Sequence, residues 1–367
     1  MINGALEKFS IVDYLESIGF KSFGLDGERI FKVYSETERE LESIYGGVGI
    51  RNISHIGVLE LKGADSIDYL HRITTNNLKN LAKEQIAKTI FTTEKGRVID
   101  LVTLVNFEDF QLILCSNVHK LKVKNWTKKY IVTDEVRVDD AGGKYTILEF
   151  LGPQATSFIS MLCGDFADSL QTNSFKVLNI EEMLFFILKV ENYDGTISFI
   201  TISDFNNAQK IIKYLIEKKS PFNFSFIGED AYNIYRIGQG IPVAPNEIND
   251  EYNPHETGLA KYISFTKGCF IGQEVIARLQ TYDKVQKRLV GVIIDHTSEL
   301  SLPQMIRSDL GEEAGILTSS CYSPFLKKRI GLAYIKKSFC HPGSELILDL
   351  NPNTQTKINV SELPFTK

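Results

Sequence analysis

The segment of the sequence most suggestive of chemistry contains a cysteine. It reads Lys267-Gly268-Cys269-Phe270-Ile271-Gly272-Gln273. An apolar run precedes the segment, and the apolar spacing after Gly272 predicts a helix. Cys269 then lies just ahead of a helix N-terminus and two residues from Lys267, and both features stabilise a thiolate. A reactive thiol is one interpretation of Cys269, and a buried, inert cysteine is the other.

Two carboxylates and one arginine are further candidates. Glu256 lies in the stretch Pro254–Leu259, and Asp100 follows two apolar residues after a turn at Lys95-Gly96. From the residues alone, Glu256 is better explained as a surface residue beside a loop proline, and Asp100 fits a solvated strand end. Arg236, which precedes a glycine turn, can position Glu256, bind a ligand carboxylate or form a structural ion pair.

The string Lys-Gly-Cys-aromatic-x-Gly-Gln-Glu at 267–274 resembles the signature of the YgfZ-type folate-binding proteins, relatives of the glycine-cleavage T-protein (aminomethyltransferase). The stretches 49–57, 151–155, 315–324 and 330–333 are similar to parts of the same superfamily. The resemblance implies an α+β fold, with a ring of α+β subdomains around a central folate pocket and a small C-terminal β-barrel. It also implies a role for tetrahydrofolate in iron–sulfur cluster assembly or repair.

Residue by residue, the resemblance gives Glu256 the place of the glutamate that holds the pterin, whose adjacent N–H donors one carboxylate can accept. Asp100 takes the first place of an acidic pair that acts in aminomethyl transfer, and Leu101 takes the second. This departure counts against the transfer reaction, because a proton-transfer group must lie within hydrogen-bond reach. The resemblance thus predicts catalytic roles for Cys269 and Asp100. It predicts folate contacts for Glu256, Arg236, Lys267 and Gln273.

Three functions remain open at this stage, and whether the protein is an enzyme is open with them. The first is a tetrahydrofolate-binding protein that supports iron–sulfur proteins through Cys269. The second is a folate-dependent aminomethyltransferase of glycine cleavage. The third is a binding protein associated with tRNA modification, which needs an uncompensated basic face at the lysine cluster 120–129. A solvated helix face explains that cluster better, since acidic residues follow it at 134–140.

The composition of the 367 residues is that of a globular protein of two or three domains, with 43% hydrophobic and 24% charged residues. A net charge of −5 argues against a large nucleic-acid footprint. The five cysteines lie far apart, and neither they nor the histidines have metal-ligand spacing. We therefore expect reduced thiols in the cytoplasm, no metal site, no membrane span and a monomer. The expected partners are a reduced folate and iron–sulfur assembly or client proteins.

The elements that position these residues follow from hydrophobic periodicity. A helix through Leu6, Phe9 and Leu15 ends at Gly19, and Asp65 caps another helix. The cleanest helical spacing covers 205–219. Strands and helices alternate, with short strands in consecutive runs, and this pattern favours an α+β fold over a doubly wound sheet. The chain is expected to divide into a folate-binding region, 1–286, and a barrel domain, 287–367. Strands are predicted at 58–61, 89–93, 98–105, 110–115, 289–294, 314–318, 330–335 and 345–350.

Overall fold

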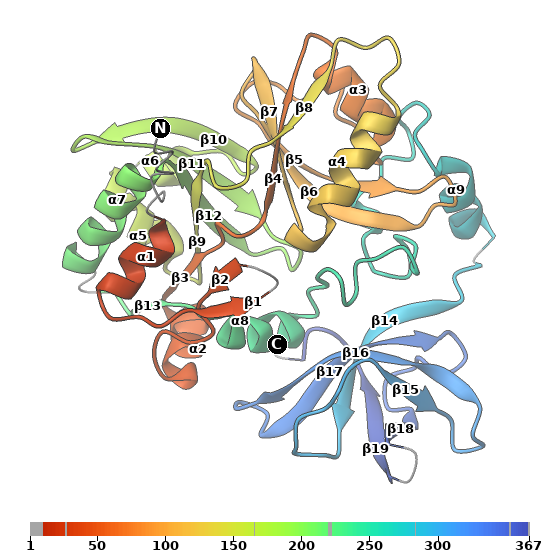
Figure 1. Ribbon diagram of the computed structural model, residues 1–367. Coiled ribbons are helices and arrows are strands. Elements are labelled where there is room, and N and C mark those ends of the chain that lie inside the picture. The colour runs from red at the N-terminus through yellow and green to blue at the C-terminus, as the bar shows by residue number, and fades with distance from the viewer. Residues whose placement is uncertain are drawn as a thin grey trace, which may run out of the picture. The chain divides into compact units, whose positions relative to one another are not determined.

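Two compact units make up the computed structural model of the chain (Figure 1). The first unit combines residues 1–56 and 141–232, and the second combines residues 57–140 and 233–367. The structure describes residues 10–25, 28–164, 166–218, 222–282, 284–351 and 354–365.

A six-stranded sheet forms the centre of the first unit, with the strand order β10-β11-β12-β9-β3-β13. Neighbouring strands are antiparallel except for β3 and β13, which run parallel. One continuous apolar core joins this sheet to helices α1, α5 and α7. The strands are β3 (Val48–Asn52), β9 (Thr146–Leu151), β10 (Ser174–Ile180), β11 (Met183–Glu191), β12 (Ile197–Ser203) and β13 (Phe224–Phe226).

The helix predicted at 205–219 is confirmed as α7 (Phe205–Lys218), since Ala208, Ile211, Ile212 and Leu215 at helical spacing are fully buried. The first predicted helix is observed as α1 (Ile11–Ser17), while Leu6 and Phe9 lie outside the described residues. Ser10 and Asp13 cap α1 reciprocally. The other elements of this unit are β1 (Phe23–Leu25), β2 (Glu28–Ile30), α2 (Thr37–Gly46), α5 (Ala155–Cys163), α6 (Phe166–Ser169) and the start of α8 (Glu229–Gln239).

A five-stranded antiparallel sheet of order β5-β6-β7-β4-β8 opens the second unit and shares one core with α3 and α4. The strands expected at 89–93, 98–105 and 110–115 are confirmed as β5, β6 and β7. Asp65 stands at the N-cap of α3 as predicted, but the expected side-chain cap is wrong: its carboxylate accepts the Glu135 backbone N–H at 2.7 Å instead. The bounds are β4 (Gly57–Lys62), α3 (Ser66–Ile73), β5 (Ile86–Thr92), β6 (Val98–Asn106), β7 (Phe110–Cys115), η1 (Asn117–His119), α4 (Lys120–Lys129) and β8 (Arg137–Asp140).

A closed six-stranded barrel completes the second unit and confirms the predicted α+β fold with a C-terminal barrel. Side chains such as Val292, Leu317 and Leu348 fill the barrel core. Two barrel strands, β15 and β19, were not predicted. No described helix is both long and apolar enough to cross a membrane. The bounds are η2 (Ala260–Tyr262), α9 (Gln273–Thr281), β14 (Lys287–Ile294), β15 (Gln304–Arg307), β16 (Glu313–Ser323), β17 (Lys328–Lys336), β18 (Glu345–Asn351) and β19 (Thr354–Ser361).

Candidate functional site

The cysteine-containing segment packs against the turn between β5 and β6. The Thr92 hydroxyl donates to the Ile271 carbonyl at 2.6 Å. Gly272 has a φ of +82°, and a Cβ there would lie 2.5 Å from the Thr93 carbonyl oxygen. Only glycine therefore fits at this contact, and α9 begins directly after it, as the sequence predicts.

Lys267 anchors the other end of the segment. Its side chain is buried, and Nζ donates to the carbonyls of His71, Thr74 (2.7 Å) and Asn76 (2.9 Å) at the end of α3. Burial lowers the pKa of Lys267 to about 8. The charge that was expected to act on Cys269 is therefore shared among three carbonyl oxygens.

Cys269 itself is exposed, so the interpretation as a buried cysteine is wrong. Gln273, the first residue of α9, accepts the Phe270 N–H at 3.3 Å through Oε1. Burial raises the pKa of Cys163 and of Cys321 to about 12 and that of Cys115 further still. The segment therefore exposes the Cys269 thiol to solvent.

Glu256 is a buried carboxylate with an arginine partner. Its Oε2 atom accepts the Asn253 N–H at 3.0 Å and Arg97 Nη1 at 3.3 Å. The interpretation as a plain surface residue is therefore wrong. Within the described part of the chain, Oε1 has no hydrogen-bond partner. One oxygen is held in place, and the other remains available to a ligand donor.

Asp100 on β6 is completely buried, which excludes a solvated strand end. Its carboxylate accepts the Ser116 N–H and hydroxyl, both at 2.8 Å, and the Leu101 N–H at 3.0 Å. His119 on η1 follows closely, with Nδ1 3.7 Å from Asp100 Oδ1. This Nδ1 atom is buried and has no hydrogen-bond partner among the described residues, and at 3.7 Å from Asp100 it is too far for a hydrogen bond in this conformation.

Arg236 does not pair with Glu256 as one expectation had it. Its Nη1 atom lies 3.3 Å from a carboxylate oxygen of the fully buried Glu247, and Nη2 donates to the Ser319 hydroxyl at 2.9 Å. Glu247 also accepts the hydroxyls of Thr318 and Ser319 at 2.6 Å. The geometry is that of the structural ion pair left open from the sequence, which ties α8 to the barrel.

Two of the predicted residues, Glu256 and Asp100, lie near the start of β6. Arg97, which binds Glu256, precedes Asp100 by three residues. The Val98 N–H also donates to the Tyr252 carbonyl at 2.8 Å, which fixes the loop that leads to Glu256. Sequence reasoning missed Arg97, Ser116 and His119, although a basic residue directly after the glycine turn Lys95-Gly96 was a usable signal.

The basic cluster on α4 is largely neutralised. Lys120 pairs with Asp140 at 3.2 Å, Lys122 with Asp250 at 2.9 Å and Lys129 with Glu94 at 2.6 Å. Helix α4 therefore lacks the uncompensated basic face that the RNA-binding interpretation requires. Among the described residues, no three His, Cys, Asp or Glu side chains are grouped as a metal site would require.

Two models of known protein domains match most of the chain. Residues 16–267 match the GCVT N-terminal domain, and residues 287–367 match the glycine cleavage T-protein C-terminal barrel domain. The chain belongs to the glycine cleavage T-protein family. This confirms the superfamily part of the resemblance, whereas the comparisons do not single out the YgfZ-type branch.

Individual relatives of this T-protein family member extend over nearly the whole chain. An aminomethyltransferase of Bacteroides fragilis is 25% identical over 96% of this chain and 97% of its own. One of Thermoanaerobacter pseudethanolicus is 24% identical, over 93% and 92%. A chloroplast protein of Arabidopsis thaliana, whose name suggests a transferase, is 28% identical, over 96% and 79%. The crystal structure of aminomethyltransferase T from Bartonella henselae matches 97% of each chain with a TM-score of 0.83 and 17% identity, which establishes the shared fold.

Proposed function

We propose that this T-protein family member binds tetrahydrofolate and acts as a one-carbon transferase of the aminomethyl type. Full-length similarity to proteins named aminomethyltransferases supports this function over the iron–sulfur role. The observation that carries the proposal is the Glu256 carboxylate, which has one oxygen held by Arg97 and Asn253 and one without a described partner.

The residues around Glu256 fit a pterin ring. A buried carboxylate that is oriented by an arginine presents its remaining oxygen in a fixed direction, and a pterin offers adjacent N–H donors to it. When bound, tetrahydrofolate would supply the nitrogen that receives the one-carbon unit. Glu256 then binds and orients the ring, and Arg97 and Asn253 hold Glu256.

Asp100 takes a positioning role in this proposal, in place of the catalytic role expected from the sequence. It is too enclosed to touch a ligand, and its oxygens already accept donors from Ser116 and Leu101. We assign proton transfer to His119, whose Nδ1 faces Asp100 at 3.7 Å and whose Nε2 is then the atom that exchanges a proton. In this proposal His119 supplies the proton-transfer group that the acidic pair lacks because Leu101 occupies its second position.

Arg236, Lys267 and Gln273 likewise become supporting residues rather than direct folate contacts. Arg236 joins α8 to the barrel, Lys267 joins the cysteine-containing segment to α3, and Gln273 closes the first turn of α9. All three residues lie in the second unit.

A reconstituted transfer assay tests the function. With an aminomethylated lipoyl carrier protein and tetrahydrofolate, wild-type protein should release ammonia, and His119→Gln should lower turnover by about 10²–10⁴-fold without weakening folate binding. His341→Gln, at an exposed histidine between β17 and β18, is the control and should retain full turnover. Wild-type protein that binds folate but releases no ammonia would contradict the transferase proposal.

One observation favours the iron–sulfur role as a second candidate. Cys269 is exposed between the two anchored ends of its segment, Lys267 and Ile271, which suits a thiol that reacts with or ligates a partner's group. This candidate predicts that Cys269→Ser folds and binds folate normally yet fails to restore iron–sulfur enzyme activity in cells that lack the protein. Full restoration by Cys269→Ser would remove it.

The remaining expectations are carried forward as proposals. We propose a cytoplasmic monomer with a folate-binding region over 1–286 and a barrel domain over 287–367. The wide spacing of five free cysteines supports a reducing compartment, and the start of β14 at Lys287 supports the boundary. Light scattering and limited proteolysis would test the oligomeric state and the boundary.

A further inference from the structure

A cavity of about 520 Å³ lies within the first unit. Residues of α1, α2, α7 and β13 line it, together with residues of the segments before α2 and after α1. Its volume falls in the range typical of small-molecule sites, roughly 300–1,000 Å³. The residues of the proposed folate site all belong to the second unit, and none of them lines this cavity.

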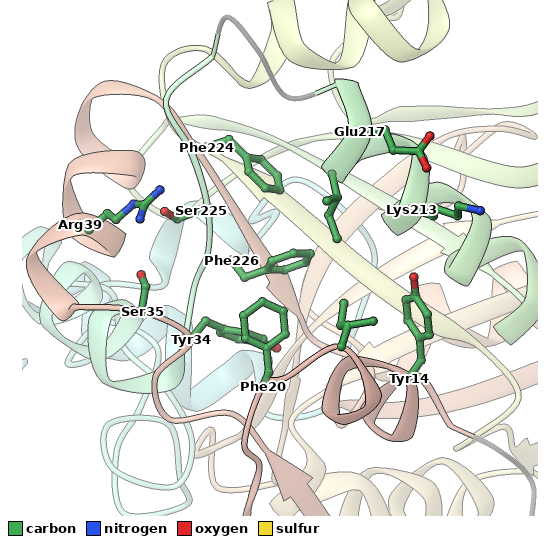
Figure 2. Close-up of a pocket in the computed structure, with 12 residues that line it drawn as sticks. Tyr14, Phe20, Tyr34, Ser35, Arg39, Lys213, Glu217, Phe224, Ser225 and Phe226 are labelled. Carbon is green, nitrogen blue, oxygen red and sulfur yellow. The ribbon is translucent and has the colours of Figure 1, made fainter.

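Aromatic rings form the wall of the cavity (Figure 2). The rings of Tyr34 and Phe226 are nearly parallel, with centroids 5.4 Å apart. Phe20 meets both edge-on, at 4.9 Å from Tyr34 and 5.5 Å from Phe226. Aromatic rings pack favourably on one another in offset-stacked or edge-to-face arrangements. This cluster therefore suits a planar aromatic ligand.

The aromatic wall is formed in advance, because Glu40 fixes the segment that carries Tyr34. The buried Glu40 carboxylate accepts the N–H groups of Tyr34 at 2.7 Å, Ser35 at 2.6 Å and Gly228 at 2.8 Å. These backbone donors are therefore already used. The side chains at the rim can supply polar partners to a ligand in the cavity.

The charged side chains that line the cavity are two cations, Arg39 and Lys213, and one carboxylate, Glu217. Figure 2 shows Arg39 on one side of the rings and Lys213 on the other. Both side chains are exposed, and neither forms an ion pair with any residue that the structure describes. Glu217 is the one acidic lining residue, and with burial it raises the pKa of Tyr14, which keeps that hydroxyl protonated. The rim therefore favours an anionic group on the ligand.

We propose that this cavity is a binding site for a small planar aromatic carboxylate. The ring system would pack against Tyr34, Phe226 and Phe20, and the carboxylate would pair with Arg39 or Lys213. The site is independent of the proposed one-carbon chemistry.

Calorimetry on the full chain with 2-naphthoate tests the site, and neutral 2-naphthamide is the comparison ligand. The double variant R39Q/K213Q should weaken naphthoate binding by at least about tenfold, because charge-assisted bonds are lost. Naphthamide binding should change less than about twofold. Glu217→Gln, which removes the competing negative charge, should strengthen naphthoate binding.

Further variants locate the binding. Ile18 lines the cavity and is 42% exposed, so Ile18→Trp should fill the space without disturbing the fold and abolish binding of both ligands. Lys210→Gln, one turn earlier on α7, and Glu256→Gln in the second unit should leave naphthoate binding unchanged. The proposal is overturned by absence of naphthoate binding, by equal loss of both ligands in R39Q/K213Q, or by undiminished binding in Ile18→Trp.

Discussion

The carboxylate of Asp100 accepts both hydrogen-bond donors of Ser116, the backbone N–H and the hydroxyl, at 2.8 Å. These bonds join β6 to the residue that precedes η1, and η1 carries His119. A buried carboxylate thereby sets the position of the histidine to which we assign proton transfer. In the proposed function Asp100, which is completely buried, acts through this contact rather than through direct access to a ligand.

Asp100→Asn should therefore reduce stability as well as turnover. The amide NH₂ group cannot accept from Ser116, so one buried donor loses its partner, at a cost of about 1–3 kcal/mol in the free energy of unfolding. Urea denaturation followed by circular dichroism would measure it. Asp109→Asn, at an exposed turn of the same sheet, is the matched control. Equal stability of the two variants would show that the Ser116 contacts contribute nothing.

Lys267→Met should destabilise the fold by about 2–4 kcal/mol at pH 7, since three carbonyl oxygens at the end of α3 lose their donor. Lys95→Met, at an exposed lysine in the β5–β6 turn, should change stability by less than about 0.5 kcal/mol. A Lys267→Met protein as stable as wild type would contradict the anchoring role and restore Lys267 as a candidate folate contact.

The same lysine makes stability depend on pH. Burial lowers the pKa of Lys267 from 10.5 to about 8, so between these values the folded chain has released a proton that the unfolded chain still binds. The free energy of unfolding of wild type, relative to Lys267→Met, should consequently rise as the pH increases from about 8 to 10.5. Parallel denaturation series across that window would measure the difference. A difference that falls with pH would mean that the carbonyl oxygens hold the ammonium charged.

Cys269 should be alkylated by iodoacetamide before Cys115, Cys163 and Cys321 at pH 7.5. It is exposed, whereas burial raises the pKa of Cys115, Cys163 and Cys321. Mass spectrometry of peptides from a time course would rank the rates. Faster labelling of any of those three thiols would show that the segment around Cys269 shields it in solution.

Removing Arg236 should be the most destabilising of these changes. Arg236→Met leaves Glu247 as an uncompensated buried charge, and breaking a buried pair in this way costs about 3–5 kcal/mol. The double variant R236M/E247M should recover part of this loss, because no buried charge remains unpaired. A single variant with normal stability but weak folate binding would instead support the ligand-binding role first expected for Arg236.

Local patterns in the sequence predicted much of the fold. The spacing of Ala208, Ile211 and Leu215 was enough for α7, and glycine followed by apolar spacing was enough for α9. Strand β19 was missed because its buried apolar residues are few, chiefly Ile358 and Val360, and its other side chains are polar. Such a strand is held by barrel closure, which no local pattern records.

The candidate site was predicted less completely, because its decisive contacts join distant parts of the chain. Arg97 and Glu256 are 159 positions apart, and Lys267 reaches Thr74 across 193. The family resemblance selected Glu256 and Asp100, but the burial of Asp100 and its Ser116 partner depend on the packing of β6 against its neighbours. Arg236 was selected correctly as a notable residue, yet its partner is Glu247 rather than Glu256.

The central claim is that the Glu256 carboxylate holds a reduced folate. Titration calorimetry with tetrahydrofolate under anaerobic conditions tests it most directly, on wild type, on Glu256→Gln and on the matched control Glu251→Gln in the same loop. We predict saturable one-site binding to wild type and to Glu251→Gln. Glu256→Gln should bind more than about tenfold more weakly, because its uncharged amide must turn a donor-only NH₂ group either toward Arg97 and Asn253 or toward the N–H donors of the pterin. Equal affinity of Glu256→Gln and wild type, or no binding by wild type, would contradict the account.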